Sequence, residues 1–204
     1  MENVQRRGLS GSVLKWVAIL TMLIDHVAVV IIYGWARYRH AWGAGIESLR
    51  FYYVLRSIGR LGFPLFCFLL VEGFRHTRSR LKYILRLLVF ALISELCFDK
   101  AFNSGWIDRS GQNVFCTLAL GLLAMVLWDW LTLGNSPDCP PWRGLAAITG
   151  AIALGAAAHY MNTDYGAMGV ALIFVLYLLH DSPWARDLIA FGVLFLVFAW
   201  GMMA

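Results

Sequence analysis

Residues 55–99 read LRSIGRLGFPLFCFLLVEGFRHTRSRLKYILRLLVFALISELCFD, two apolar runs on either side of a short basic segment at 72–82. A helix that crosses a membrane needs about 20 mainly apolar residues. Lys and Arg concentrate in the loops that face the cytoplasm. The stretch therefore predicts two membrane helices joined by a cytoplasmic loop.

The rest of the chain continues this pattern of long apolar runs between clustered charges. Of 204 residues, 60% are hydrophobic and only 14% are charged, and the mean hydropathy is +0.68. A soluble domain carries about a quarter charged residues, so the composition excludes one. We expect one all-α domain over residues 1–204, a polytopic transmembrane helix bundle of about seven spans, with six to eight possible.

The expected spans are 13–33, 50–71, 82–101, 113–133, 143–160, 165–180 and 186–203. The sixth is short, and Pro64 should kink the second because proline removes a helical hydrogen bond. Lys and Arg on the side of the N-terminus are Arg6, Arg7, Lys15, Arg75, Arg78, Arg80, Lys82, Arg143 and Arg186; those on the other side are Arg37, Arg39, Arg50, Lys100 and Arg109. This asymmetry predicts a cytoplasmic N-terminus.

Ionisable and polar side chains lie inside or next to the predicted spans, mostly in pairs. They are Asp25 and His26, Arg56 and Arg60, and Glu95 and Asp99, together with Asn113 and Thr117 in the fourth span and His159 and Asp164 on either side of the turn after the fifth. A charge at the centre of a membrane helix costs about 2.5–3.5 kcal/mol, so such residues face inward and are often functional. In the seven-span arrangement they all lie toward the outer face. Asp25 is expected to pair with Arg56 or Arg60.

His26 is the candidate for acid–base chemistry in this set, because histidine changes protonation state near neutral pH. The competing interpretation is structural, since arginine–carboxylate pairs can simply hold helices together. No arrangement of histidines suits a metal ion, and we expect no metal. The net charge of +5 suits anionic lipid headgroups, whereas no basic stretch suggests a nucleic-acid partner.

The basic segment is the second candidate site. Its cations and one histidine are Arg75, His76, Arg78, Arg80 and Lys82. Several such groups close together could bind the phosphates of a cofactor. The alternative is a patch that sets the topology and contacts lipid headgroups.

Four stretches together resemble the TraX family, the F-pilin acetylase group of conjugation systems. They are 14–30 (LKWVAILTMLIDHVAVV), 55–99 as quoted above, 113–125 (NVFCTLALGLLAM) and 164–179 (DYGAMGVALIFVLYLL). They touch five of the seven predicted spans, in order, and cover about half of the chain. No single piece is specific, but the combination is.

The resemblance implies an acetyltransferase of the bacterial inner membrane, with cytoplasmic acetyl-CoA as the donor. The acceptor would be an amine such as the N-terminus of a pilin-like peptide, or a hydroxyl of a surface glycan or lipid. The roles it suggests are catalysis for His26, Asp25, Arg56 and Arg60, binding of CoA for Arg75, His76, Arg78, Arg80 and Lys82, and binding of the acceptor for Glu95, Asp99, Asn113 and Asp164. Two other functions remain open: a small proton-coupled transporter or flippase, and a non-catalytic assembly factor for a pilus or conjugation channel.

Overall fold

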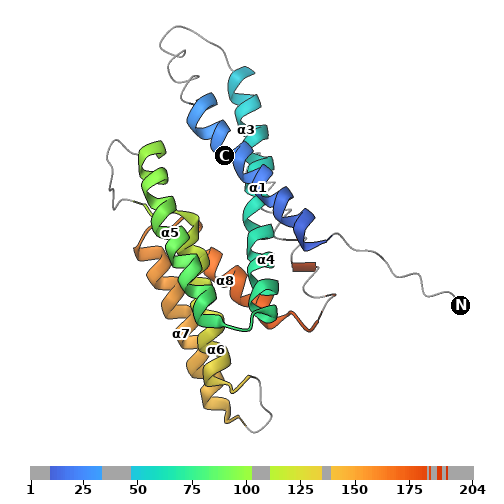
Figure 1. Cartoon of the computed structure of the whole chain (residues 1–204), viewed down its shortest axis with the longest axis vertical. Helices are drawn as coiled ribbons and strands as arrows, with labels where there is room; N and C mark the ends of the chain where they lie inside the picture. Colours follow the sequence, from blue (N-terminus) through green and yellow to red (C-terminus); the bar gives the residue numbers. More distant parts are fainter. Residues whose placement is uncertain are drawn as a thin grey trace, which may run out of the picture. The chain divides into compact units, whose positions relative to one another are not determined.

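The structure, a computed structural model, describes residues 10–33, 47–102, 111–134 and 139–182, together with positions 184, 188, 189 and 192. Its elements are α1 (Gly11–Val27), η1 (Ala28–Tyr33), α3 (Glu47–Arg60), α4 (Gly62–His76), α5 (Arg80–Phe102), α6 (Val114–Leu131), α7 (Pro141–Tyr160) and α8 (Gly166–Leu178) (Figure 1). All these elements are helices, which confirms the all-α class.

Three helical stretches in the described residues are long and apolar enough to cross a membrane: Gly11–Ile31, Phe51–His76 and Val114–Leu131. They match the first, second and fourth predicted spans. Helices also occupy the third, fifth and sixth, and α8 is short, as expected. Most of the seventh lies outside the described residues, and the count of seven stays a prediction. The chain is a membrane protein with at least three helices of spanning length.

The described residues form two compact units, with the boundary in α4 after Leu69. In the first unit α1 packs against α3. The helix begins at a serine cap, where the backbone N–H of Val13 donates to Ser10 Oγ at 3.3 Å. Its last turn widens into the π-helical η1 at Ala28, a distortion often found at functional sites. Whether the whole chain acts as one domain stays a prediction.

Pro64 explains the interruption between α3 and α4. Proline offers no N–H, and its ring collides with the carbonyl of the residue four positions before it, which here is Arg60. The helix ends at that residue and resumes at Gly62, with a backbone hydrogen bond of 3.2 Å from Leu61 N to Ile58 O in the turn. The expected disturbance of the second span is therefore present, three residues before the proline itself.

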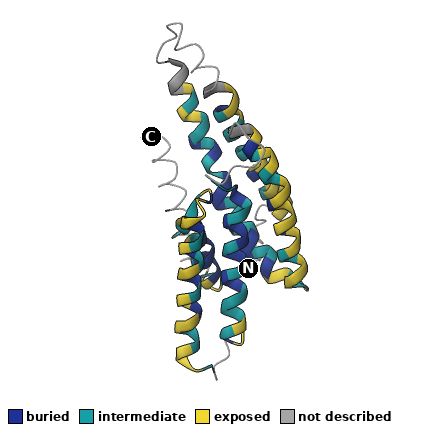
Figure 2. Cartoon of the chain, turned by 90° about the vertical axis from the view of Figure 1, so that its left-hand side faces the viewer, coloured by how far each residue is buried: buried dark blue, intermediate teal, exposed yellow. Residues whose placement is uncertain are grey.

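The core of the second unit lies where α6, α7 and α8 meet. Ala124, Ala151, Ala158, Val170 and Phe174 are buried together there, with the burial pattern visible in Figure 2. Small residues let the helices approach closely, as they do in membrane bundles. At Gly121 an added Cβ would lie 2.4 Å from Ile173 Cδ1, so only glycine fits without a shift of that side chain.

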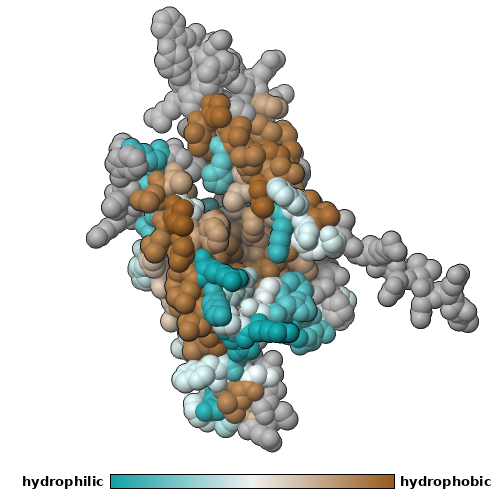
Figure 3. Space-filling model, viewed as in Figure 1, coloured by the Kyte–Doolittle hydropathy of each residue, from teal (hydrophilic) through white to brown (hydrophobic). Residues whose placement is uncertain are grey.

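One side of α5 is apolar and exposed. Leu85, Val89, Leu92 and Ile93 are each more than half uncovered, and Leu92 reaches 72%. Figure 3 shows this apolar surface running along α5, with hydrophilic residues at its N-terminal end. A contiguous surface of this kind marks contact with lipid or another apolar partner. The exposed face of α5 therefore supports placing this helix in the membrane.

Candidate functional site

The first group of predicted site residues lies on α1 and α3, within the first unit. Asp25 Oδ2 accepts a hydrogen bond from Arg56 Nη1 in an ion pair, with side chains 18% and 23% exposed respectively. The expected pairing of Asp25 with one of the two arginines is thus confirmed for Arg56. Asp25 Oδ1 is buried and has no hydrogen-bond partner within the described residues. This oxygen faces Gly59, where an added Cβ would lie 2.6 Å from it.

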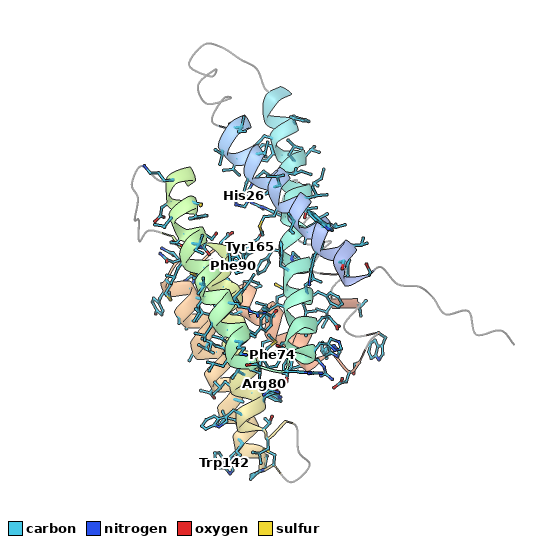
Figure 4. All side chains as sticks on the ribbon, in the orientation of Figure 1. His26, Phe74, Arg80, Phe90, Trp142 and Tyr165 are labelled. Carbon is cyan, nitrogen blue, oxygen red and sulfur yellow. The ribbon has the colours of Figure 1, made fainter. Side chains whose placement is uncertain are left out.

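His26 is half-buried beside this pair, on α1 (Figure 4). Its Nδ1 lies 2.8 Å from the backbone carbonyl oxygen of Met22. A carbonyl can only accept, so Nδ1 is the protonated nitrogen and donates. In the neutral ring the lone pair then resides on Nε2. The backbone of α1 therefore fixes the tautomer that can take up a proton at Nε2.

Gly59 allows α1 and α3 to meet at this point. A Cβ added to it would lie 2.3 Å from the Cβ of Asp25, far inside contact distance. Gly62, one turn further, is similarly close to Thr21, with 2.9 Å between the added Cβ and Thr21 Oγ1. Both glycines hold the Asp25–Arg56 pair at short range. Sequence reasoning missed them, although glycines inside a membrane helix often mark close packing.

The second group lies on α5 and α6, within the second unit. Glu95 Oε2 accepts from both the backbone N–H and the Nδ2 of Asn113, and the backbone bond measures 3.0 Å. Asn113 also donates to Ala91 O at 2.8 Å and accepts from Phe115 N at 2.9 Å, which caps α6. Asn113 thus joins the start of α6 to α5. Glu95 Oε1 is buried and without a hydrogen-bond partner in the described part of the chain.

Asp99 and Asp164 complete the residues predicted to bind the acceptor. Asp99 is 1% exposed. Asp164 is exposed, and its backbone is anchored by Thr117 Oγ1, which donates to the Asp164 carbonyl, and by its own N–H, which donates to Gln112 O at 2.9 Å. Glu95, Asp99, Asn113 and Asp164 belong to the second unit, whereas His26 belongs to the first. Their union in one site stays a prediction.

The basic segment joins α4 to α5 as the sequence predicts, but the loop itself is only residues 77–79: Arg75 and His76 end α4, and Arg80 and Lys82 begin α5. Two of its arginines are already paired: Arg75 Nη2 lies 3.0 Å from Asp181 Oδ1, and Arg80 pairs with Asp129. The guanidinium of Arg80 also stacks over the ring of Phe74, 4.9 Å from its centroid (Figure 4). Arg78 and Lys82 are exposed and make no ion pair with any described residue. These two are the better placed to receive a phosphate.

The comparisons with known proteins can be set beside this geometry. The sequence model of the family described as "TraX protein" matches residues 10–204. The chain belongs to the TraX family.

A curated relative of the chain is the "Probable fimbrial assembly protein FimC, serogroup H1" of Dichelobacter nodosus. The two are 38% identical over 122 residues, which cover 56% of this chain and 44% of that protein. The chain thus spans less than half of this relative's length. No solved structure matches the chain.

The part of the chain matched to TraX also contains a network that sequence reasoning missed. Asp129 accepts from the hydroxyl of Tyr177 as well as pairing with Arg80, and the ring of Tyr177 packs edge-on to Phe74 with centroids 5.6 Å apart. Asp129 was detectable as a carboxylate at the end of an apolar run, WDWL. Its partners lie on other helices, Arg80 on α5 and Tyr177 on α8, and no local sequence pattern predicts these contacts.

His180 is another residue of this TraX chain that the sequence did not single out. Its Nε2 lies 3.1 Å from Glu72 Oε1 and its Nδ1 lies 3.5 Å from Asp181 Oδ1. His76 approaches the other oxygen of Glu72 at 3.6 Å. The ends of α4 and α8 are therefore tied by alternating acids and bases. Because both His180 nitrogens face carboxylates, its role in this arrangement is to fasten the helices.

Proposed function

We propose that this TraX protein is an acetyltransferase of the bacterial inner membrane that uses acetyl-CoA. The observation that carries the proposal is the His26 ring, whose Nδ1–H donates to Met22 O at 2.8 Å, so that Nε2 is the basic nitrogen of the neutral ring. The ring sits next to the ion pair of Asp25 and Arg56. Acyl transfer to an amine or hydroxyl requires a base that removes a proton from the acceptor and a cation that stabilises the oxyanion. His26 would be the base and Arg56 the cation.

The reaction follows from these groups. Nε2 of His26 takes the proton from the acceptor N–H or O–H while the acceptor atom attacks the thioester carbonyl carbon. The resulting oxyanion is stabilised by Arg60 or Arg56, and Asp25 holds Arg56 in place. When the C–S bond breaks, the proton on His26 passes to the departing thiolate. A short-lived acetyl group on Nε2 is the two-step form of the same transfer.

The donor would bind on the cytoplasmic side, with the N-terminus in the cytoplasm. The CoA phosphates would rest on the basic segment, and Arg78 and Lys82 would contact them first because their charges are uncommitted among the described residues. Arg75, His76 and Arg80 would shape the same surface through their carboxylate partners. The cations of this segment and their exposure support the assignment.

The acceptor would be a pilin-like peptide with a free N-terminal amine, or a hydroxyl on a surface glycan or lipid. The relative from Dichelobacter nodosus is named as a probable fimbrial assembly protein, which supports a link to pili. In this proposal the carboxylates of Asp25 and Glu95 accept hydrogen bonds from such an amine or hydroxyl; each has one buried oxygen without a hydrogen-bond partner among the described residues. Asp99 and Asp164 would add negative charge for an ammonium group.

A non-catalytic assembly factor is the second candidate, and the name of that relative favours it. In this case the Asp25–Arg56 pair and the network around Asp129 serve only to fasten helices. Charge-neutral replacements at His26 and Asp25 would then leave assembly intact as long as the protein folds. The two candidates therefore differ in the effect of conservative changes at His26.

The test uses purified protein in detergent and acetyl-CoA labelled in its acetyl group, without an acceptor. A transferase is expected to release CoA slowly or to carry label on the protein, and both signals should disappear in His26→Ala. Ser12→Ala, an exposed change on the same helix, is the matched control and should behave as the wild type. Equal CoA release by wild type and His26→Ala would refute the role given to His26. Absence of any CoA binding by thermal shift would refute the transferase itself.

A further inference from the structure

Two hollows in the second unit meet at the end of α7. One is a groove of about 450 Å³ between α7 and α8, and the other is a pocket of about 300 Å³ at the α7–α8 turn. Both are lined by His159 and Ala167. The groove is otherwise apolar, whereas the pocket is lined in part by the polar residues Asn162, Thr163 and Tyr165. Because they share these two lining residues, we treat the two hollows as one amphipathic trough with His159 between its apolar and polar parts.

The groove owes its depth to small residues. Gly155, Ala156 and Ala171 line it, and Ala156 and Ala171 are exposed. A Cβ added to Gly155 would lie 3.8 Å from Ala167 Cβ, which is an ordinary contact distance. The two helices therefore leave room for one more methyl group at this point. Ile152, another lining residue, is 67% exposed. An open apolar surface of this kind marks contact with lipid or another apolar partner.

The polar pocket has a fixed frame. Asn162 and Tyr165 have φ of 50° and 65°, which non-glycine residues adopt only where their surroundings impose it. Gln112 imposes it from outside the turn: its N–H donates to Asn162 O at 3.0 Å, and its carbonyl accepts from Asp164 N at 2.9 Å. Thr117 Oγ1 adds a 3.0 Å hydrogen bond to Thr163 Oγ1. A frame held this firmly presents its polar groups in one arrangement.

The charges of the trough narrow the choice of ligand. Among the described residues, its lining contains no Lys, Arg, Asp or Glu. The His159 side chain is exposed, touches the Tyr160 ring with centroids 6.1 Å apart, and makes no hydrogen bond or ion pair with any described residue. A neutral imidazole offers one donor and one acceptor, which suits a hydroxyl. A phosphate would find no lysine or arginine here.

A second groove on α7 serves as an internal comparison. It has a volume of about 540 Å³ and is lined only by apolar residues of α6 and α7, among them Leu127, Trp130 and Ala153. It has no polar end, so it offers nothing to a headgroup. The α7–α8 trough differs from this groove because its apolar part ends at a polar side chain, that of His159.

We propose that this trough binds a membrane lipid with an uncharged, hydroxyl-bearing headgroup. The hydrocarbon chain lies in the α7–α8 groove, and His159 exchanges hydrogen bonds with the headgroup hydroxyl in the polar pocket. This assignment goes beyond the proposed function, because it requires neither acetyl-CoA nor His26. It also specifies the chemistry of the headgroup: the same lipid with a phosphate in place of the hydroxyl should bind less well.

The test uses the full-length protein in phosphatidylcholine nanodiscs that contain a trace of diacylglycerol with a diazirine in one acyl chain. Irradiation followed by peptide mass spectrometry locates the label. We expect it on the groove-lining residues of α7 and α8. Ala156→Leu and Ala171→Leu, on the two walls, should each lower it roughly fivefold because they overfill the groove. Ala146→Leu is the matched control: it is exposed on α7, lines neither hollow, and should label as wild type.

The headgroup is tested with phosphatidic acid that carries the same diazirine chain. Diacylglycerol should label the wild type roughly fivefold more strongly, a difference of the size expected for one hydrogen-bonded group. In His159→Phe the two probes should label alike, while the label stays in the groove. Size-exclusion chromatography confirms that each variant is folded, and the two wall variants lie on different helices.

Three results would overturn the proposal. The first is equal labelling of the α6–α7 groove, or no loss in either wall variant, which would indicate only the lipid that surrounds any membrane protein. The second is equal or stronger labelling by phosphatidic acid in the wild type. The third is no label in the groove at all, which would point to a protein helix as its occupant. Because no step involves CoA, each result is independent of whether the acetyl transfer test succeeds.

Discussion

A Cβ atom at Gly59 would lie 2.3 Å from the Cβ of Asp25 and 2.6 Å from its Oδ1. The backbones of α1 and α3 therefore approach each other at the point where the first span carries its carboxylate. This approach lets the short carboxylate of Asp25 reach Arg56 on the neighbouring helix. The Asp25–Arg56 ion pair thus requires a glycine at position 59. The geometry around His26 depends on both the glycine and the ion pair.

Replacement of Gly59 by alanine should destabilise the first unit. The added methyl group must displace the Asp25 backbone region, and overpacking of this kind typically costs about 1–3 kcal/mol. We expect a lower midpoint of thermal unfolding in detergent and loss of the CoA release assigned to His26. Gly144→Ala is the control, because nothing lies within 4 Å of its added Cβ. An unchanged midpoint for Gly59→Ala would show that the close approach of the two helices is not required.

The Asp25–Arg56 pair should show coupling in a double-mutant cycle. Asp25→Asn leaves Arg56 without its counter-charge, and Arg56→Gln leaves Asp25 without its own, so each single change lowers stability. In the double variant neither charge remains, and its loss should be smaller than the sum by about 0.5–3 kcal/mol. Chemical denaturation in mixed micelles measures all four proteins. Strict additivity would mean that the two residues do not interact.

The second-span arginine four residues later provides the contrast. Arg60→Gln should show less coupling with Asp25→Asn than Arg56→Gln does, because the structure gives the ion pair to Arg56. If Arg60 instead serves the reaction, its replacement should lower CoA release and leave the unfolding midpoint nearly unchanged. Comparison of the two arginines therefore separates the structural role from the catalytic one.

The helices of this chain could be predicted because they are long, apolar and bounded by charges. The disturbance near Pro64 and the shortness of α8 followed from local rules of the same kind. The π-helical turn at Ala28 did not, because AVVIIY reads as ordinary helix and nothing in it signals an extra residue per turn. The third span, predicted over 82–101, forms the helix α5, but its spanning role stays a prediction, because the helix carries charges such as Arg80, Lys82 and Asp99 near its ends.

The candidate site was predictable where residues share one helix and much less so where they meet across helices. The spacing of Arg56 and Arg60 places them on one face, and pairing with Asp25 required only charge complementarity. The links from Asn113 to Glu95, and from His180 to Glu72, join residues 18 and 108 positions apart. Such contacts depend on how helices pack, and no periodicity encodes them.

The contacts of Asp129 allow a graded prediction for the second unit. Tyr177→Phe removes one hydrogen bond but leaves the ion pair with Arg80, so it should cost about 0.5–1.5 kcal/mol. Asp129→Ala removes both contacts of a side chain that is only 8% exposed, and should cost more, about 1–3 kcal/mol. Thermal unfolding of the two variants gives the order. A larger effect for Tyr177→Phe would show that ring packing against Phe74, not Asp129, dominates this region.

The basic segment leads to a prediction about CoA that separates its cations into two kinds. Arg78→Ala combined with Lys82→Ala should weaken the thermal stabilisation by CoA, with binding roughly three- to tenfold weaker, because these charges have no partner among the described residues. Without CoA the double variant should unfold at the wild-type temperature.

Arg75→Ala should do the reverse: it breaks the pair with Asp181, so the free protein loses stability while CoA binding changes less. Rising salt should weaken CoA binding by the wild type more than by the double variant. The variant already lacks the two cations whose attraction to CoA the salt would screen. If Arg75→Ala instead abolishes CoA binding in a protein of unchanged stability, the pair with Asp181 opens to admit the cofactor, and the division between paired and unpaired cations is wrong.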